Sequence, residues 1–296
     1  MATIITDLKD AFRRGNICIR LIYINVGVFV LTELLRVVLQ LFNRSLIGVF
    51  EWFQLPASLP RVVLQPWSIL TYMFMHAGVL HILFNMLWLY WFGMLFLQFF
   101  SSKHLRGLYV LGGICGGLLY IAAYNLFPYF RPVIDGSFML GASASVLSVV
   151  TATAYREPNY PIRLLLFGEI RLKYLALVVV GMDLLFITSG NAGGHIAHLG
   201  GALAGLWFAA GLTKGVDRTS WINRLFDAFV SLFDHKARRP KMKVHYGSKR
   251  QSDYDYNARK KAQSEEIDRI LDKVKQSGYE NLTTEEKKTL FDASKR

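Results

Sequence analysis

Apolar residues along this chain gather into six runs, each close to the length of a membrane-spanning helix. A bilayer core of roughly 30 Å is crossed by about 20 predominantly apolar residues in helical form. The runs hold few charged residues, and they cover about residues 17–42, 80–100, 105–127, 138–155, 172–190 and 194–213. Beyond Lys214 the chain is polar and charged. The pattern therefore predicts an all-α membrane protein, a six-helix transmembrane bundle with a small helical tail.

The same pattern divides the chain into four parts. Residues 1–16 form a charged N-terminus, and residues 17–213 form the membrane domain. Residues 214–263 combine an amphipathic helix with a basic linker, and residues 264–296 form a small helical module. The first apolar run is too long for a secretory signal, and no small-residue cleavage site follows it. We therefore expect this run to remain attached as a span.

The connection between the first two runs, at about 43–79, is too long for a tight turn. It mixes large apolar side chains with prolines, namely Phe50, Trp52, Phe53, Leu55 and Trp67 with Pro56, Pro60 and Pro66. Tryptophan rings are favoured at the membrane interface, so one interpretation is a structure that lies there. The other interpretation is an ordinary loop with a few anchoring aromatics. Composition alone leaves both open.

The basic residues indicate an orientation in the membrane. The chain is 53% hydrophobic and has a formal net charge of +13. A positive charge of this size could indicate a nucleic-acid partner. Its lysines and arginines, however, gather in alternate connections, as the positive-inside rule predicts for a membrane protein. The connections after the second and fourth runs are rich in basic residues and hold Lys103, Arg106, Arg156, Arg163, Arg171 and Lys173. The connections after the first and third runs have fewer, namely Arg44, Arg61 and Arg131. We therefore expect both termini in the cytoplasm and no nucleic-acid partner.

Polar side chains inside apolar runs are candidates for function, because burying them in a membrane costs free energy. Ser143 lies at the start of the fourth run, among the small residues Gly141, Ala142 and Ala144. Small neighbours would admit a peptide backbone, and a helix N-terminus supplies free N–H groups and a positive dipole end. Ser143 is therefore a candidate nucleophile. The alternative is ordinary packing of small residues between membrane helices.

His198 lies in the last run, close to Gly201 and Gly205, whose GxxxG spacing allows two membrane helices to approach closely. An imidazole at such a contact can act as general base and then as general acid. The alternative is a hydrogen-bonded core histidine. His195 is nearer the helix end and is expected at the interface. These two histidines with His81 could bind zinc, but no carboxylate or cysteine completes the set, so we expect no metal.

His81 and Asn85 are four residues apart in the second run and hence on one helical face. Both side chains can donate hydrogen bonds, and two donors beside a nucleophile would form an oxyanion hole. An interhelical hydrogen-bonding pair is the alternative.

The motifs HxxxN in the second run, GxSx at the start of the fourth and AHxGGxxxG in the last occur in this order. With this order and spacing, over about residues 17–213, the chain resembles the bacterial type of rhomboid intramembrane protease. His76, five residues before His81, matches a histidine that this family often has. The resemblance implies six transmembrane helices with a C-terminal cytoplasmic extension.

By this resemblance, Ser143 would be the nucleophile and His198 the general base and acid. His81, Asn85 and the backbone N–H of Ser143 would stabilise the oxyanion. The implied activity is hydrolysis of peptide bonds in or near the transmembrane helices of membrane-protein substrates, without cofactor or metal. The implied location is a bacterial plasma membrane, where lipids are further partners. A rhomboid-like pseudoprotease that binds membrane proteins without cutting them is the alternative, and the presence of both Ser143 and His198 argues against it.

Three positions depart from the family pattern. Ala144 replaces a common glycine, and its methyl group should narrow the site. Leu147 replaces an aromatic residue that often stacks on the catalytic histidine, so His198 should be held less firmly. Ser68 follows Trp67 where the family has an arginine, which should alter the lipid contacts of the first connection.

Two acidic residues, Glu33 and Asp183, fall inside apolar runs. An aspartyl intramembrane protease needs two carboxylates in facing spans, but neither residue has the flanking motif of that family. Asp183 is interpreted as a polar residue of the fifth run without a role. We expect His198 to work without an acidic partner, as a dyad whose imidazole is oriented by packing.

The C-terminal module shows two helix signals. Apolar residues at helical spacing predict a first helix that ends at Gly278, and Thr283 with Glu286 forms a capping box for a second. The module holds too few apolar residues to be stable without a partner. Because the candidate motifs all precede Leu212, we expect that catalysis does not require the module. It resembles the short C-terminal helical modules of some bacterial rhomboids, and this resemblance implies a docking or regulatory role. A disordered solubilising tail is the alternative.

Overall fold

The computed structural model forms two compact units, Met1–Phe233 and Asp234–Arg296. It describes residues 6, 9, 10 and 12 and residues 14–44, 47–164, 168–233 and 249–294. Much of the predicted N-terminal segment lies outside the described residues, as do residues 234–248, which hold the first half of the predicted basic linker.

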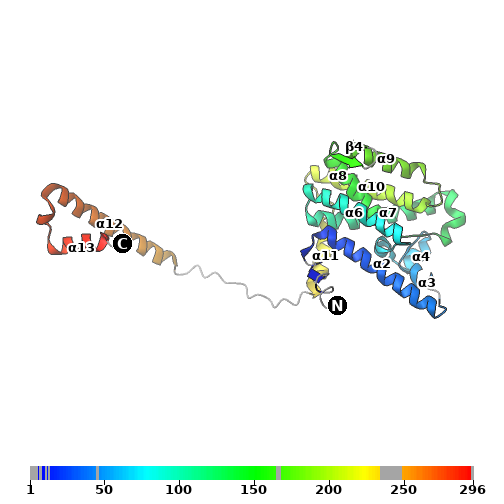
Figure 1. Cartoon of the computed structure of the whole chain (residues 1–296), viewed down its shortest axis with the longest axis horizontal. Helices are drawn as coiled ribbons and strands as arrows, with labels where there is room; N and C mark the ends of the chain where they lie inside the picture. The colour runs from blue at the N-terminus through cyan, green and yellow to red at the C-terminus, as the bar shows by residue number, and fades with distance from the viewer. Residues whose placement is uncertain are drawn as a thin grey trace. The chain divides into compact units, whose positions relative to one another are not determined.

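The first unit is a bundle in which each predicted apolar run holds one long helix (Figure 1). These helices are α2 (Ile17–Leu41), α6 (Val79–Phe99), α7 (Ser102–Leu126), α8 (Ser143–Arg156), α9 (Leu172–Leu185) and α10 (Ala192–Thr213). Within the described residues, α2, α6, α7 and α10 are long and apolar enough to cross a membrane. The remaining two, α8 and α9, have 14 residues each. The predicted all-α membrane bundle is therefore confirmed.

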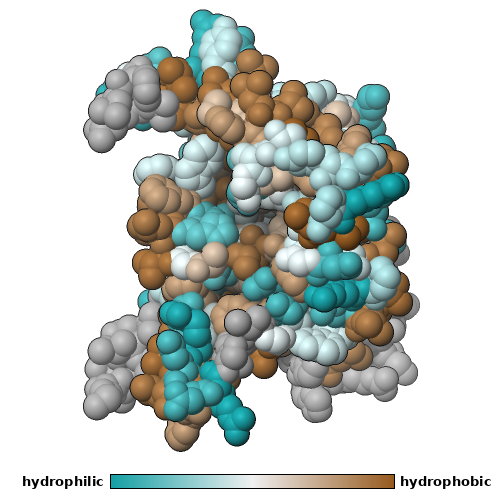
Figure 2. All heavy atoms as spheres, turned by 90° about the vertical axis from the view of Figure 1, so that its right-hand side faces the viewer, coloured by the Kyte–Doolittle hydropathy of each residue, from teal (hydrophilic) through white to brown (hydrophobic). Residues whose placement is uncertain are grey.

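Helix α10 forms the centre of the bundle. It makes the most extensive contacts with α7 and α8, while α2 packs against α6 and α7, and α9 against α8 and α10. In the ribbon view α2 and α9 accordingly lie on opposite sides (Figure 1). Their outward faces expose large apolar side chains, among them Leu31, Leu34 and Val37 of α2 and Leu177, Val178 and Leu185 of α9. Apolar surface of this kind suits contact with lipid. Figure 2 shows hydrophobic side chains on a further face of the molecule.

Helix α8 begins later than the apolar run predicts. Residues Phe138–Met139 form the short strand β2, which pairs antiparallel with β1 (Leu55–Pro56) of the first connection. Gly141 then adopts a φ of 126°, a conformation that residues with a side chain rarely adopt. The predicted start at residue 138 is therefore wrong, because strand pairing and this glycine delay the helix until Ser143.

Close backbone contacts join α8, α10 and α7. A methyl group on Gly201 would overlap the carbonyl oxygen of Ala144, and one on Gly205 would overlap that of Ser148. On the α7 side, a methyl group on Gly200 would lie 2.6 Å from the carbonyl oxygen of Cys115. The predicted close approach at the GxxxG spacing is therefore confirmed. It brings the start of α8 opposite the first turns of α10.

Replacing Gly201 by alanine is expected to lower the melting temperature of the detergent-solubilised protein by roughly 2–12 °C. The added methyl group must push two backbones apart, and overpacking of this kind costs about 1–3 kcal/mol. Gly181→Ala is the matched control, because this helical glycine has no atom within 4 Å of an added methyl group. Thermal unfolding followed by circular dichroism would measure both. Equal melting temperatures for the two variants would contradict the close contact.

The first connection is structured, which favours the interface interpretation over an ordinary loop. It holds α3 (Ile47–Glu51), β1, α4 (Leu59–Leu64), α5 (Ser68–Thr71) and the 3₁₀ helix η1 (Tyr72–Phe74). The buried Tyr72 hydroxyl donates to the carbonyl oxygen of Gly113 on α7 at 2.6 Å. Trp52 and Trp67 stack with ring centroids 5.5 Å apart and are about half exposed, as suits rings at a membrane surface. Ser68 is fully buried.

Shorter elements complete the first unit. They are the 3₁₀ helix η2 (Pro128–Gly136), the antiparallel pair β3 (Pro161–Leu164) and β4 (Gly168–Arg171), and α11 (Ser220–Phe233). Arg106 of α7 donates to the Asn223 side chain at 2.9 Å and to Asp227 at 2.8 Å. Helix α11 therefore belongs to the first unit, whereas the sequence pattern placed it with the linker.

The second unit contains α12 (Lys249–Ser277), the 3₁₀ helix η3 (Tyr279–Asn281) and α13 (Thr284–Ser294). Helix α12 begins before residue 264, the predicted start of the module. The Thr283 N–H donates to the Glu286 carboxylate at 2.8 Å, and the Glu286 N–H donates to the Thr283 hydroxyl at 3.3 Å. The predicted capping box is confirmed. The Thr283 N–H, assisted by Lys273, lowers the pKa of Glu286 to about 2.

Candidate active site

The four candidate side chains of the sequence analysis line one cavity of about 620 Å³. Ser143 comes from α8, His198 from α10, and His81 and Asn85 come from α6. Much of the remaining wall comes from residues 136–140 and from Gly190, Asn191, Gly193 and Gly194. Helices far apart in sequence therefore converge on a single site.

Ser143 is the first residue of α8, and Ala142 precedes it as the N-cap. The first intrahelical bond runs from the Val146 N–H to the Ala142 carbonyl, so the N–H groups of Ser143 and Ala144 have no partner within the helix. Gly141 allows the close approach of α6, because a methyl group there would lie 2.9 Å from the His81 ring. The serine hydroxyl is thus placed at a helix N-terminus that can bind negative charge.

His198 connects Ser143 to an acidic residue. Its Nε2 lies 2.6 Å from the Ser143 Oγ, and its Nδ1 lies 2.8 Å from the Asp183 Oδ1. An ionised carboxylate can only accept a hydrogen bond, so Nδ1 carries the ring proton. In the neutral imidazole the Nε2 lone pair therefore faces the serine hydroxyl, which donates to it. This is the tautomer that a general base requires.

His81 and Asn85 are both oriented by bonds within their own segment. The Ala77 N–H donates to His81 Nδ1 at 3.2 Å, so the proton of the neutral ring is on Nε2, beside Gly141. The Asn85 amide donates one N–H to the His81 carbonyl at 2.8 Å, which leaves its second N–H for the cavity. In the described part of the chain neither side chain bonds to another helix, so the interhelical alternative finds no support.

His76 supports His81 from behind. It is buried, and its ring contacts the His81 ring edge-on with centroids 5.2 Å apart. Burial, reinforced by the neighbouring His81, lowers the pKa of His76 to about 4. The side chain is therefore neutral at pH 7 and adds no positive charge beside His81.

Asp183 was predicted to have no role and His198 to have no acidic partner, and both predictions are wrong. This residue of α9 is only 5% exposed, and its Oδ1 accepts hydrogen bonds from both His198 and His195, each at 2.8 Å. His195 is therefore part of the site and not merely an interfacial residue. A signal was available, because an acidic residue in an apolar run meets the same criterion that selected Ser143 and His198.

The expectation that no carboxylate completes a set of metal ligands is also wrong. Asp183, His195 and His198 each offer a ligand atom, and these atoms lie within 4.8 Å of one another. Their nitrogen and oxygen donors are of the type that zinc accepts. However, both Nδ1 atoms already have the Asp183 oxygen as hydrogen-bond acceptor. Hydrogen bonding alone thus accounts for the arrangement of the three side chains.

A second, apolar pocket of about 210 Å³ also reaches Ser143 and His198. Its other lining residues come from α6, α8 and α9 and are Phe84, Asn85, Trp88, Val146, Leu147 and Val179. Leu147 therefore borders the space beside His198. Ala144 lines neither cavity, and a methyl group on Gly116 of α7 would lie 2.7 Å from its Cβ. Its methyl group is directed to α7, so the expectation that it narrows the site is wrong.

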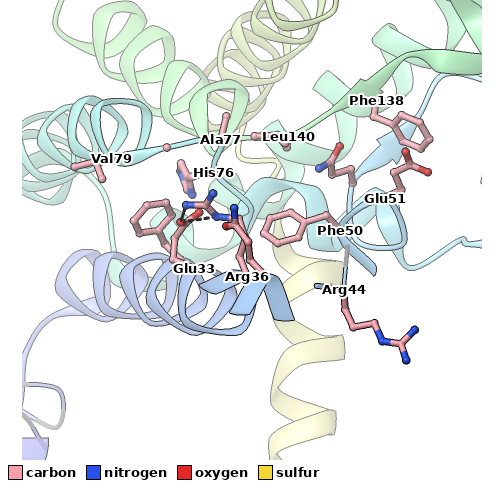
Figure 3. A pocket seen from close by; sticks show the side chains of 14 residues that line it. Glu33, Arg36, Arg44, Phe50, Glu51, His76, Ala77, Val79, Phe138 and Leu140 are labelled. Carbon is pink, nitrogen blue, oxygen red and sulfur yellow. Dashed lines mark hydrogen bonds and ion pairs between the residues drawn. The ribbon is translucent and has the colours of Figure 1, made fainter. Parts of the chain in front are cut away.

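A third pocket, of about 790 Å³, borders the first and shares Ala77, Phe138 and Leu140 with it (Figure 3). Glu33 lines this pocket and bonds Arg36 at 2.6 Å. The two acidic residues of the apolar runs therefore have separate partners, Arg36 for Glu33 and histidines for Asp183. Their helices, α2 and α9, also do not pack extensively against each other, so the structure gives no support to the facing pair of carboxylates that an aspartyl protease needs.

Comparisons with known proteins agree with the resemblance seen in the motifs. A family model described as "Rhomboid domain" matches residues 63–215, and one described as "Family of unknown function (DUF6576)" matches residues 251–296. The chain is 29% identical over 157 residues to "RHOMBOID-like protein 12, mitochondrial" of Arabidopsis thaliana, covering 50% of this chain and 47% of that protein. It is 23% identical over 163 residues to "Rhomboid-like protease 3" of Toxoplasma gondii, covering 55% and 58%. The chain thus spans about half the length of these relatives.

Proposed function

Because this integral membrane protein belongs to the rhomboid family, we propose that it is a serine endopeptidase that hydrolyses peptide bonds in or near the transmembrane helices of other membrane proteins. The observation that carries the proposal is the 2.6 Å contact between His198 Nε2 and Ser143 Oγ. Because the Nδ1–H of His198 donates to the Asp183 carboxylate, Nε2 is the acceptor in that contact. A serine becomes a useful nucleophile when a base is placed in this way.

In the first step the Ser143 Oγ attacks the carbonyl carbon of the scissile bond. The Oγ–C bond forms, the hydroxyl proton moves to His198 Nε2, and the carbonyl π electrons move to the oxygen. The backbone N–H of Ser143, the Nε2–H of His81 and the free amide N–H of Asn85 are the donors available to this oxyanion. Donors fixed before the reaction stabilise the developing charge without reorganisation.

The tetrahedral intermediate then collapses. The C–N bond breaks, and the imidazolium of His198 gives its proton to the leaving amine. Water attacks the acyl-enzyme with His198 again as base, and the second collapse releases the acid and returns the proton to Ser143. One water is consumed for each bond cut, and no cofactor is needed.

The two cavities at Ser143 suit the two reactants. The apolar pocket between α6 and α9 offers space for apolar atoms of a substrate helix, whereas the larger cavity contains polar groups that can hold water. Substrate and water can therefore reach the same serine from different sides.

A pseudoprotease that binds membrane proteins without cutting them is the second candidate. The presence of both Ser143 and His198, in contact and in the required tautomer, favours the enzyme. Purified protein incubated with a panel of single-span substrates, with and without a serine-directed inhibitor, tests the proposal. Inhibitor-sensitive fragments are expected, and uncut substrates that still bind would favour the pseudoprotease.

We further propose that both termini face the cytoplasm of a bacterial plasma membrane. The distribution of basic residues between the connections supports this orientation. One matched relative is named as mitochondrial, so family membership alone does not specify the membrane. Reporter fusions at the C-terminus, active only on one side of the membrane, would test the orientation.

Removal of the second unit is expected to leave catalysis unchanged. Truncation after Phe233 retains every residue that lines the two cavities at Ser143, and it retains α11 with its bonds to Arg106. Cleavage of a model substrate in detergent, compared at equal concentrations of folded protein, is the measurement. Lost activity in a truncated protein that remains monodisperse would show that the second unit takes part in catalysis.

A further inference from the structure

We propose that Asp183 is a positioning residue for His198 and that His195 in turn holds Asp183. The inference rests on the proposed protease function and adds a third and a fourth side chain to the Ser143–His198 dyad. It starts from one shared atom, because Asp183 Oδ1 accepts from the Nδ1 atoms of both histidines at 2.8 Å.

The local structure brings these side chains together. Asp183 lies in the last turn of α9, and His195 and His198 lie in the first two turns of α10. Residues three apart in a helix share a face, so both imidazoles can reach the same neighbouring helix. The short connection between the two helices places the end of one beside the start of the other.

Asp183 has no role in the fold that would explain it more simply. It is 5% exposed, and its side-chain partners in the described part of the chain are the imidazoles of His195 and His198, with no lysine or arginine. Its Oδ2 is buried without a hydrogen-bond partner there. A buried carboxylate held in this way is weak evidence for stability, because apolar replacements of buried ion pairs are often neutral. What the contact does is select the tautomer and the orientation of the His198 ring.

His195 restrains the carboxylate itself. A carboxylate held only by His198 could rotate about its own side chain, and the imidazole would turn with it. The second N–H, donated by His195 to the same oxygen, fixes that oxygen between the two rings. The His198 ring is therefore held by Asp183 at Nδ1 and contacts Ser143 at Nε2.

The carboxylate also acts electrostatically when His198 takes the serine proton. An imidazolium forms 2.8 Å from a negative charge, and this favours the protonated ring in the transition state. The other titratable groups that face His198 are His195 on its own helix, His81 from α6 and the phenols of Tyr120 and Tyr124 from α7. On α8, the group that contacts His198 is the Ser143 hydroxyl. No lysine or arginine lines the cavity.

The test is the pH dependence of cleavage by the full-length protein and by Asp183→Asn in detergent. Loss of one charge-assisted hydrogen bond is expected to lower kcat roughly 10- to 100-fold at pH 7, with KM unchanged. Without the negative charge the imidazole is harder to protonate, so the acid limb of the kcat/KM profile should move to lower pH. Glu33→Gln is the matched control, since it neutralises the other acidic residue within an apolar run.

His195 provides a second, independent test. His195→Ala should lower kcat less than Asp183→Asn does, because the carboxylate remains. His195→Asn should restore most of the loss, because its amide N–H can replace the Nδ1–H. This pair of variants also decides the matter if Asp183→Asn does not fold, and equal rates for His195→Ala and the wild type would then overturn the proposal.

Three further outcomes are decisive. Unchanged kcat and an unchanged acid limb in folded Asp183→Asn, while cleavage still requires Ser143, would overturn the positioning role alone. Equal cleavage by wild type and Ser143→Ala would instead overturn the protease function. Activity that is lost on dialysis against EDTA and regained with Zn²⁺ would show that Asp183, His195 and His198 hold a metal ion, which also overturns the proposal.

Discussion

Ser143→Ala is expected to lower kcat/KM by about 10⁶-fold and to leave the fold intact. The serine and its base act as one unit, so removing either member costs roughly as much as removing both. His198→Ala should therefore give a loss of the same order, and the double variant should be no worse than either single one. The measurement is the rate at which the purified variants cleave a single-span substrate.

Ser145→Ala is the matched control for this prediction. Ser145 lies two residues further along α8, is fully buried, and its Oγ lies 4.0 Å from the Met73 sulfur, away from His198. Its replacement should reduce activity little. If Ser143→Ala cleaved at a rate near that of wild type, the assignment of the nucleophile would be wrong.

Asn85→Ala is expected to lower kcat by about 10²–10³-fold, the usual loss for one oxyanion donor, with KM little changed. The side chain lies beside Ser143 and has one amide N–H directed away from its intrahelical bond. His81→Ala should be similar or worse, because the ring is both a donor and a contact for Gly141. Steady-state kinetics on one substrate would separate kcat from KM.

Asn125→Ala is the matched control for Asn85. The Asn125 amide makes the same kind of bond to the carbonyl four residues before it, at 2.8 Å, but it does not line the cavity. Its removal can reduce stability through the lost bond to Ala57 but should leave kcat unchanged. A change confined to KM in Asn85→Ala would indicate that Asn85 positions the substrate and does not stabilise the oxyanion.

Much of the fold could be predicted because membranes restrict what a sequence can do. Helices are the spanning elements available outside closed barrels, so six apolar runs were enough to predict the bundle. The GxxxG spacing at Gly201 and Gly205 predicted a close contact, because small residues let two membrane helices approach each other. The late start of α8 could not be predicted, because it depends on the pairing of β2 with a strand more than 80 residues earlier and on the φ of Gly141.

The candidate site, like the fold, could be predicted from the sequence only in part. Ser143, His198, His81 and Asn85 could be found because each is polar within an apolar run. The bond from Asp183 to His198 could not, since it depends on how the end of α9 meets the start of α10. The direction of the Ala144 methyl group could not be predicted from the sequence either, because it depends on how α8 is rotated against α7.

The most direct test of the account is to identify the atom that reacts with a serine-directed phosphonate. Full-length protein would be treated with a fluorophosphonate, digested and analysed by mass spectrometry, with His198→Ala treated in parallel. We expect one adduct, on Ser143, and almost none in His198→Ala, because the hydroxyl is nucleophilic only when the imidazole takes its proton. An adduct on another residue of an active preparation, or equal labelling of Ser143 in His198→Ala, would contradict the central claim that His198 activates Ser143.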